Sequence, residues 1–222
     1  SGTKERNIPG VRQDMSKKFV QNGPDNGPLF ILAHGAGAPS DSEFMVNMAE
    51  LLAERGICVV RFNFPYMEMN KEDGKKRPPN RLPALLEDYE QLVNLLGRPC
   101  VIGGKSMGGR VASVLAQTQE SPFVKGCGCL GYPFHPPGKP DNLRTDHLQQ
   151  LSKPLFIAQG TRDALGSQEE VSGYDLADDI ELLWLEDGNH DLKPRVKSGF
   201  TQQQHLQTTA DALAELIRRC LS

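Results

Sequence analysis

Short apolar runs recur along the chain and are separated by longer, mixed segments. Runs of about four to eight apolar residues between turn residues are typical of strands that are buried on both faces. A run at Val101 and Ile102 leads into a glycine-rich turn, and residues 18–20 predict an early edge strand. The other runs predict strands at residues 29–33, 57–62, 123–130, 154–159 and 180–185.

Apolar residues with helical spacing lie between the predicted strands. One helix is predicted from Phe44 to Arg55 and should end at Gly56, with Ser40 and Glu43 at the spacing of a capping box. Strands that alternate with helices predict an α/β fold, with a mostly parallel sheet and helices on both faces. The other predicted helices cover residues 82–96, the segment after Ser106, residues 166–177, and a C-terminal stretch that starts near Gln202 and includes 209–221.

The turn at Ser106 carries the clearest chemical signal. Gly104, Ser106 and Gly108 form a G-x-S-x-G pattern between a strand and a helix, which is the context of a strained nucleophile turn. Glycine on either side lets the backbone close tightly, and the serine hydroxyl stands at a helix N-terminus whose N–H groups can receive an oxyanion. A phosphate-binding loop is excluded, because that motif needs a glycine five positions before Gly104, where Pro99 stands.

A nucleophilic serine needs a base and an acid, which follow it in the chain in this kind of site. His190 lies in a polar loop directly after the last predicted strand, where such a base should be placed. Asp163 follows the preceding predicted strand, and its carboxylate would orient and stabilise the imidazole. Asp146 is the alternative acid. Three other histidines precede Asp163, and His205 lies at a helix start, so the order of the chain disfavours them.

An oxyanion hole needs a second N–H from an early loop. Residues 34–38 follow the strand at 29–33 and are small after the first position, so backbone can approach a substrate there. We predict that the N–H groups of Ala36 and Met107 form the hole. His34 is predicted to fix this loop, because it precedes the nucleophile.

These elements resemble the α/β-hydrolase superfamily over nearly the whole chain, and within it the small, capless, dienelactone-hydrolase-like group of predicted serine hydrolases. The resemblance implies a three-layer α/β-hydrolase sandwich without a full cap domain, and a hydrolase that uses no cofactor. Dienelactone hydrolases proper use a cysteine where Ser106 stands, so their reaction is not transferred to this chain. The likeness rests on the motifs His34-Gly35-Ala36-Gly37-Ala38, Arg61-Phe62-Asn63-Phe64-Pro65-Tyr66 and Gly104-Lys105-Ser106-Met107-Gly108-Gly109.

Two functions are consistent with these residues. The first is a serine hydrolase that cleaves a carboxylic ester or thioester of a small molecule through an acyl-enzyme on Ser106, with amide cleavage also open. The second is a catalytically idle binding or scaffold protein that kept the fold, because a fold does not guarantee activity. The candidates for substrate contact are His34, Lys105, Tyr66 and Tyr132.

Two irregular segments, residues 66–81 and 131–146, should leave the carboxyl edge of the sheet, where ligands bind in α/β folds. Neither is long enough for a full cap domain, so we expect an open site. The basic residues between 71 and 81 could attract an anionic substrate, although charge runs usually face water.

The length and composition of the chain are consistent with a single α/β domain that has a substantial core. The 222 residues are enough for a single α/β domain, with residues 1–16 as a flexible or partly ordered start. A net charge of −3 gives no sign of a nucleic-acid partner, no apolar stretch reaches the length of a membrane span, and no signal peptide is visible, so a cytoplasmic location is expected. The sequence does not indicate an oligomeric state.

The five cysteines have no metal-type spacing, so we expect reduced thiols and no metal site. Cys127 and Cys129 are expected to point to opposite faces of their strand.

Overall fold

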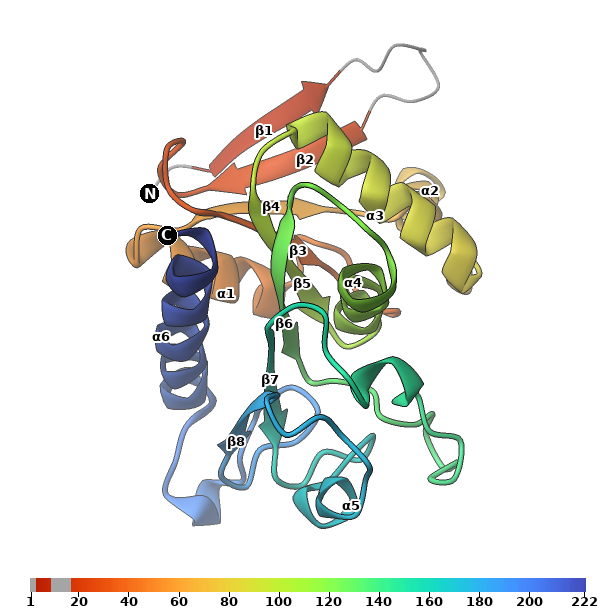
Figure 1. The fold of residues 1–222 in the computed structure, drawn as a ribbon, viewed down its shortest axis with the longest axis vertical. Helices are drawn as coiled ribbons and strands as arrows, with labels where there is room; N and C mark the ends of the chain where they lie inside the picture. Colours follow the sequence, from red (N-terminus) through yellow and green to blue (C-terminus); the bar gives the residue numbers. More distant parts are fainter. Residues whose placement is uncertain (1–2, 9–16) are drawn as a thin grey trace.

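The computed structural model describes residues 3–8 and 17–222, and its centre is a single eight-stranded sheet (Figure 1). The strand order is β1-β2-β4-β3-β5-β6-β7-β8. Strands β3 to β8 run parallel, whereas β1 and β2 are antiparallel to their neighbours. The strands are β1 (Thr3–Ile8), β2 (Lys17–Asn22), β3 (Leu29–Ala33), β4 (Cys58–Phe62), β5 (Cys100–Lys105), β6 (Val124–Leu130), β7 (Leu155–Gly160) and β8 (Glu181–Leu185).

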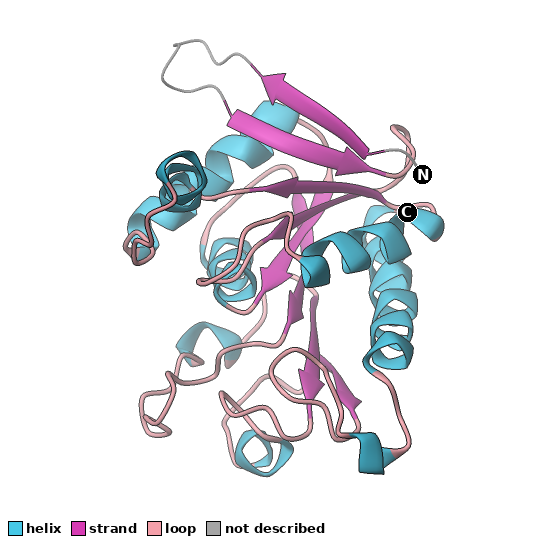
Figure 2. Cartoon of the chain, turned by 180° about the vertical axis from the view of Figure 1, so that it is seen from behind, coloured by secondary structure: helices cyan, strands magenta, loops and turns pink. Residues whose placement is uncertain are grey.

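Helices cover both faces of this sheet and give the molecule three layers (Figure 2). Helices α1 and α6 contact each other and pack on one face, whereas α3 and α4 contact each other and pack on the opposite face. The helices are α1 (Glu43–Glu54), α2 (Pro65–Asp73), α3 (Leu82–Leu96), α4 (Met107–Thr118), α5 (Gln168–Ser172) and α6 (Gln202–Leu221), and the short 3-10 helices are η2 (Asp146–Leu148) and η3 (Val196–Ser198).

The predicted fold class is confirmed: the sheet is mostly parallel, helices lie on both faces, and the described residues hold no full cap domain. The alternation of side chains along each strand builds two cores at once. On β3, Ile31 enters the core under α3 and α4, while Phe30 and Leu32 enter the core under α1 and α6. Strands buried on both faces are therefore apolar at successive positions, which is the pattern that the sequence shows.

Several local predictions were wrong. The strand at 18–20 is not an edge strand, because β2 pairs with β4 on one side and with β1, which was not predicted, on the other. Residues 1–2 and 9–16, which belong to the expected flexible start, lie outside the described residues. The predicted capping box of Ser40 does not form: Ser42 is the N-cap residue of α1, and its side chain makes no capping hydrogen bond.

Two segments also differ from their predicted secondary structure. Segment 66–81 is not wholly irregular, since Pro65 at the first turn starts the nine-residue helix α2, which ends at Gly74. Segment 166–177 forms only the five-residue helix α5. Its Ser167 and Glu170 form the capping box that starts the helix.

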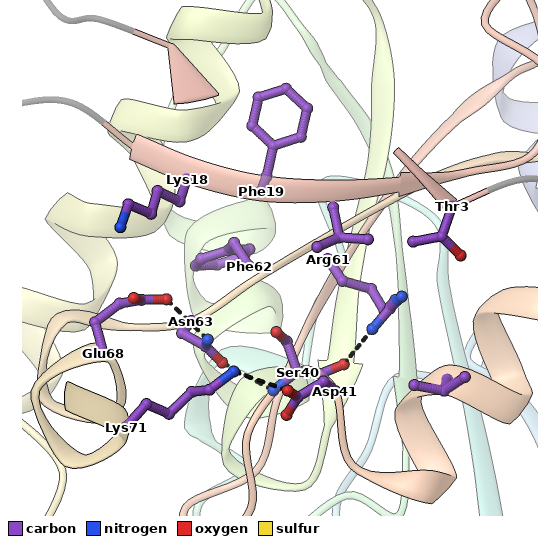
Figure 3. Close-up of a pocket in the computed structure, with 12 residues that line it drawn as sticks. Thr3, Lys18, Phe19, Ser40, Asp41, Arg61, Phe62, Asn63, Glu68 and Lys71 are labelled. Carbon is purple, nitrogen blue, oxygen red and sulfur yellow. Dashed lines mark hydrogen bonds and ion pairs between the residues drawn. The ribbon is translucent and has the colours of Figure 1, made fainter. Parts of the chain in front are cut away.

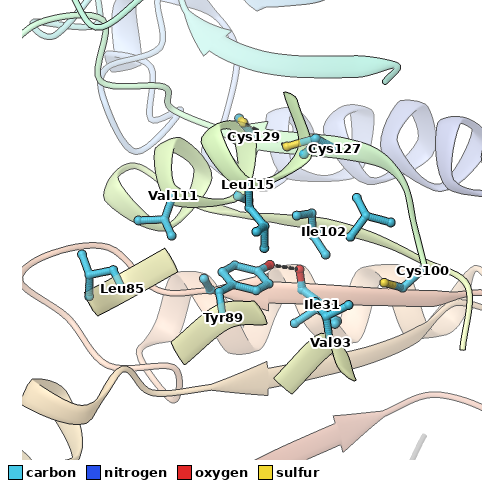
Figure 4. Close-up of a cluster of buried hydrophobic side chains, with 14 of the residues drawn as sticks. Ile31, Leu85, Tyr89, Val93, Cys100, Ile102, Val111, Leu115, Cys127 and Cys129 are labelled. Carbon is cyan, nitrogen blue, oxygen red and sulfur yellow. Dashed lines mark hydrogen bonds between the residues drawn. The ribbon is translucent and has the colours of Figure 1, made fainter. Parts of the chain in front are cut away.

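The expectation for the paired cysteines was wrong as well. Residues two apart on a strand share a face, so Cys127 and Cys129 point to the same side, with their Sγ atoms 3.8 Å apart (Figure 4). Burial raises the pKa of the Cys127 thiol well above its ordinary value. The Cys127 thiol therefore stays protonated within the core.

Tyr89 of α3 joins two neighbouring strands of the sheet (Figure 4). Its fully buried Oη atom lies 2.9 Å from the carbonyl oxygen of Ile31 on β3 and 2.7 Å from that of Gly103 on β5, and it accepts a hydrogen bond from the Gly103 N–H at 3.0 Å. A phenol has a single proton, so it donates to one carbonyl at a time. The hydroxyl thus satisfies polar backbone just before the strands reach the carboxyl edge.

We expect Tyr89→Phe to lower the free energy of unfolding by about 1–3 kcal/mol, because the buried Gly103 N–H then loses its partner. Chemical denaturation with a two-state fit measures this loss. Tyr174→Phe is the matched control, since the buried Tyr174 Oη has no hydrogen-bond partner among the described residues. Equal losses in the two variants would contradict the role of the Tyr89 hydroxyl.

Candidate active site

Ser106 stands in the turn between β5 and α4, and its backbone is strained. Its φ of 50° and ψ of −117° lie outside the regions that side-chain-bearing residues favour. A Cβ on Gly104 would lie 2.4 Å from the carbonyl carbon of Gly108, and one on Gly108 would lie 2.5 Å from the carbonyl oxygen of His34. Only glycine fits at these two positions, so the turn packs directly against the backbone that leaves β3.

Three side chains from separate loops form a continuous line of polar contacts. The Oγ atom of Ser106 lies 2.7 Å from Nε2 of His190, and Nδ1 of His190 lies 2.9 Å and 3.0 Å from the two carboxylate oxygens of Asp163. A carboxylate can only accept, so it selects the tautomer with the proton on Nδ1 and leaves Nε2 to accept from the serine hydroxyl. The arrangement can therefore remove a proton from Ser106 and hold it on the imidazole.

Asp163 is fully buried after β7, where the N–H of Leu165 donates to its Oδ1 at 2.8 Å. The loop that carries His190 is hydrogen-bonded to the residues between β7 and Asp163. The N–H of Asp187 donates to Oγ1 of Thr161, and the Arg162 Nε donates to the Asp187 carbonyl at 3.0 Å. These contacts fix the acid loop and the histidine loop relative to each other.

The carboxylate of Asp187 pairs with Arg195, whose hydrogen bonds hold the pKa of this carboxyl well below its ordinary value. This contact closes the loop on itself. Asp187 therefore shapes the histidine loop.

Lys105, the residue before Ser106, forms a clamp that the sequence did not reveal. Lys105 is 7% exposed, and its ammonium group donates to the carbonyl oxygen of His190 at 2.9 Å, while Oδ1 of Asp191 lies 3.2 Å away. Burial lowers the pKa of Lys105, and the Asp191 carboxylate opposes that shift. The strand that carries the serine thus holds the histidine backbone directly.

The loop at residues 34–38 is held by two other side chains. His34 is fully buried: its Nε2 accepts from the N–H of Phe64 at 3.0 Å, and its Nδ1 donates to the carbonyl of Gly35 at 2.6 Å. The hydroxyl of Tyr66, at the start of α2, donates to the Ala36 carbonyl at 2.9 Å. Ala36 lines the same cavity as Ser106, and Met107 is the first residue of α4, directly after Ser106. The oxyanion role of these two residues remains a prediction.

A cavity of about 320 Å³ opens in front of these groups. It is lined by Ser106, His190, Lys105, the loop 35–38, and apolar side chains of α1 that include Phe44. The aromatic ring of Phe44 lies 5.3 Å from the Lys105 ammonium, a cation–π distance. The cavity therefore combines apolar walls with polar groups at Ser106, His190 and Lys105.

The other predicted residues lie outside the line of contacts. Asp146 is in η2 and does not contact His190. Three of the candidates for substrate contact are at most 2% exposed, namely His34, Tyr66 and Tyr132. The structure therefore does not support direct contact between these residues and a substrate. Of the four candidates for substrate contact, Lys105 lines the cavity.

A second serine–histidine contact joins Ser113 and His147, with 2.8 Å between Oγ and Nε2. Ser113 is fully buried inside α4 and donates to the carbonyl of Arg110. Burial lowers the pKa of His147 to about 4. This pair is a packing contact, since Ser113 is fully buried against its own helix.

A cavity of about 640 Å³ lies away from the serine, between β2, β4 and the helices α1 and α2 (Figure 3). Its polar groups satisfy one another: Lys71 pairs with Asp41 at 2.8 Å, and Asn63 donates to Glu68. Within residues 3–8 and 17–222, no cluster of His, Cys, Asp or Glu could hold a metal ion, and no helix is long and apolar enough to cross a membrane.

Residues 26–218 match the family model described as the alpha/beta hydrolase domain. Among solved structures, Est1E from Butyrivibrio proteoclasticus is similar with a TM-score of 0.71 at 16% identity, covering 100% of this chain and 99% of that chain. The dienelactone hydrolase of Anabaena variabilis gives a TM-score of 0.73 at 17% identity, covering 99% of each chain. The esterase domain of a Rhodothermus marinus protein gives 0.69 at 16% identity and covers all of both chains. Identities this low show a shared fold.

The buried His34 generates a prediction about acid stability. Burial lowers its pKa to about 4 from the ordinary 6.5. Between these values the unfolded chain binds a proton that the folded chain does not, so the free energy of unfolding falls as pH falls from 6.5 to 4. His34→Gln should flatten this fall by about 3 kcal/mol. Urea unfolding of both proteins across this pH range measures the difference, and parallel curves would contradict it.

Proposed function

The chain belongs to the alpha/beta hydrolase domain family, and on that basis we propose that it is a serine hydrolase that cleaves a carboxylic ester or thioester of a small molecule. The observation that carries the proposal is the unbroken line of contacts from Ser106 through His190 to Asp163. We further propose that the chain is one α/β-hydrolase domain, because both apolar cores lie against one sheet. A cytoplasmic location stays a prediction.

The proposed first half-reaction transfers the acyl group to the enzyme. His190 Nε2 takes the Ser106 proton as the oxygen attacks the substrate carbonyl carbon, and the carbonyl oxygen becomes an oxyanion. The N–H groups of Met107 and Ala36 are the proposed donors to that oxyanion, with Met107 at the positive end of α4. The tetrahedral intermediate then breaks its bond to the leaving group, which takes the proton from His190, and the acyl group stays on Ser106.

The proposed second half-reaction repeats these steps with water. His190 removes a proton from the water as its oxygen attacks the acyl carbon, and the proton then returns to Ser106 Oγ as the acid product leaves. Asp163 holds the imidazole in the required tautomer throughout and stabilises the transient imidazolium. Lys105 keeps the His190 backbone in place beside the nucleophile.

Ser106→Ala should abolish both hydrolysis of p-nitrophenyl acetate and labelling by a fluorophosphonate probe, because the nucleophilic oxygen is gone. The fold should persist, since alanine tolerates a helix start. Circular dichroism checks the fold, and gel fluorescence with a rate assay checks the chemistry.

Ser113→Ala is the matched control, because it removes the other serine that contacts a histidine. It should keep labelling and hydrolysis. A wild-type chain that neither labels nor hydrolyses any of a panel of acyl esters would instead favour the idle binding protein.

Asp163→Asn should lower kcat by about 10³–10⁴-fold, because an amide can donate to Nδ1 and favour the wrong imidazole tautomer. Asp146→Asn should have little effect, since Asp146 lies outside the line of contacts. Steady-state kinetics with one ester compares the two variants. A reversed ranking would assign the acid to Asp146 and leave Asp163 as a loop-fixing residue.

A further inference from the structure

We infer that the substrate carries an anionic group, a carboxylate or a phosphate, which binds in a cationic cleft beside the loop 35–38. This inference rests on the proposed function and adds the substrate class to it. The cationic cleft has a volume of about 350 Å³. Its charged lining is Lys71, Lys75, Lys76 and Arg77.

The cationic cleft adjoins the cavity of the proposed nucleophile. Ala36 and Gly37 line both spaces, so the loop 35–38 is their shared boundary. Ala36 is also the proposed donor to the oxyanion. A substrate whose carbonyl oxygen reaches Ala36 can therefore extend one arm across the exposed backbone of Ala36 and Gly37 into the cleft.

The cationic cleft is positively charged, whereas the chain as a whole has a negative net charge. Four basic side chains and no acidic side chain line it, although the chain has a net charge of −3. Lys71 pairs with Asp41, and Arg77 pairs with Asp73. Lys75 and Lys76 form no ion pair within the described ranges, so two positive charges remain for a ligand. Such a local excess attracts anions and favours their binding.

The basic side chains stand on a fixed turn. Gly74 ends α2 with a φ of 70° and reverses the chain. Asn70 Oδ1 then accepts from the backbone N–H of Arg77 at 3.1 Å, and Asp73 Oδ1 accepts from the N–H of Lys75 at 3.0 Å. Because these bonds preset the backbone, binding an anion requires little ordering of the loop.

A purely local explanation covers only part of this arrangement. Cations near the end of a helix interact favourably with its dipole, which accounts for Lys71 in the last turn of α2. It does not account for Lys75, Lys76 and Arg77, which lie beyond the helix and line the same cleft. The larger cavity of Figure 3 is a weaker candidate for an anion, because the carboxylates of Asp41 and Glu68 line it.

Two matched pairs of substrates test the inference and separate the sources of the anion. p-Nitrophenyl hydrogen glutarate against p-nitrophenyl butyrate tests a carboxylate on the acyl part. Butyryl-coenzyme A against S-butyryl-N-acetylcysteamine tests phosphates on the leaving group. We expect the wild-type enzyme to show a higher kcat/KM for the charged member of at least one pair. The preference should shrink as KCl rises from about 0.05 to about 0.5 M, because salt screens exposed charges.

Lys75→Gln combined with Lys76→Gln should lower the charged-to-neutral ratio of kcat/KM about tenfold. Both side chains are exposed, so the fold should be retained. The control combines Lys125→Gln with Lys153→Gln, which removes the same charge at the amino ends of β6 and β7, the opposite edge of the sheet. This control should keep the wild-type ratio.

The outcomes separate the two proposals. An enzyme that hydrolyses the neutral esters but shows no preference for either charged partner would overturn the cationic cleft and leave the proposed function standing. An equal loss of the ratio in both double variants would also overturn it, because net charge alone would then explain the preference. A chain that hydrolyses none of the four substrates, and that no fluorophosphonate labels, would overturn both.

Discussion

The close approach of the Ser106 turn to the backbone leaving β3 is the constraint on which the site depends. Gly104 and Gly108 leave no room for a Cβ, because the neighbouring carbonyl groups of Ala33 and His34 fill that space. The turn therefore brings the start of α4 and the loop 34–38 together from strands that are adjacent in the sheet. Backbone strain at Ser106, with its positive φ, is sustained by this packing on both sides.

The histidine loop also packs closely on the sheet edge, since a Cβ on Gly160 would lie 2.2 Å from the carbonyl oxygen of Gly188. Polar contacts hold the loop as well. Lys105 holds the His190 carbonyl, Thr161 holds the Asp187 backbone, and Asp187 pairs with Arg195. The first of these comes from β5, which ends at Lys105 beside Ser106, so Ser106 and His190 are fixed to the same element. Placing a buried ammonium group next to the site costs desolvation, and the two oxygens that it contacts offset part of this cost.

The sequence predicted those parts of the molecule that depend on periodicity and on backbone sterics. The buried strands and the helices α1, α3 and α6 follow from apolar spacing, and the glycines around Ser106 follow from the geometry of a tight turn. The clamp by Lys105 and the bond from Tyr66 to Ala36 could not be predicted, because each joins segments that are close only after folding. Helix α2 has too few apolar positions to show a helical stripe, and it was missed for that reason.

The order of the strands explains why the site lies where it does. The chain leaves β3 toward α1, on one face of the sheet, and leaves β5 toward α4, on the other face. Because β3 and β5 are neighbours, their loops diverge and open a crevice at the carboxyl edge, as in other α/β sheets whose connections reverse. Ala36 lies on one side of this crevice and Met107 on the other. The helix α2 is the next element past the β3 loop, which explains why its basic turn borders the same opening at Ala36 and Gly37. Under the proposed function, a substrate held between Ala36 and Met107 would extend in that direction.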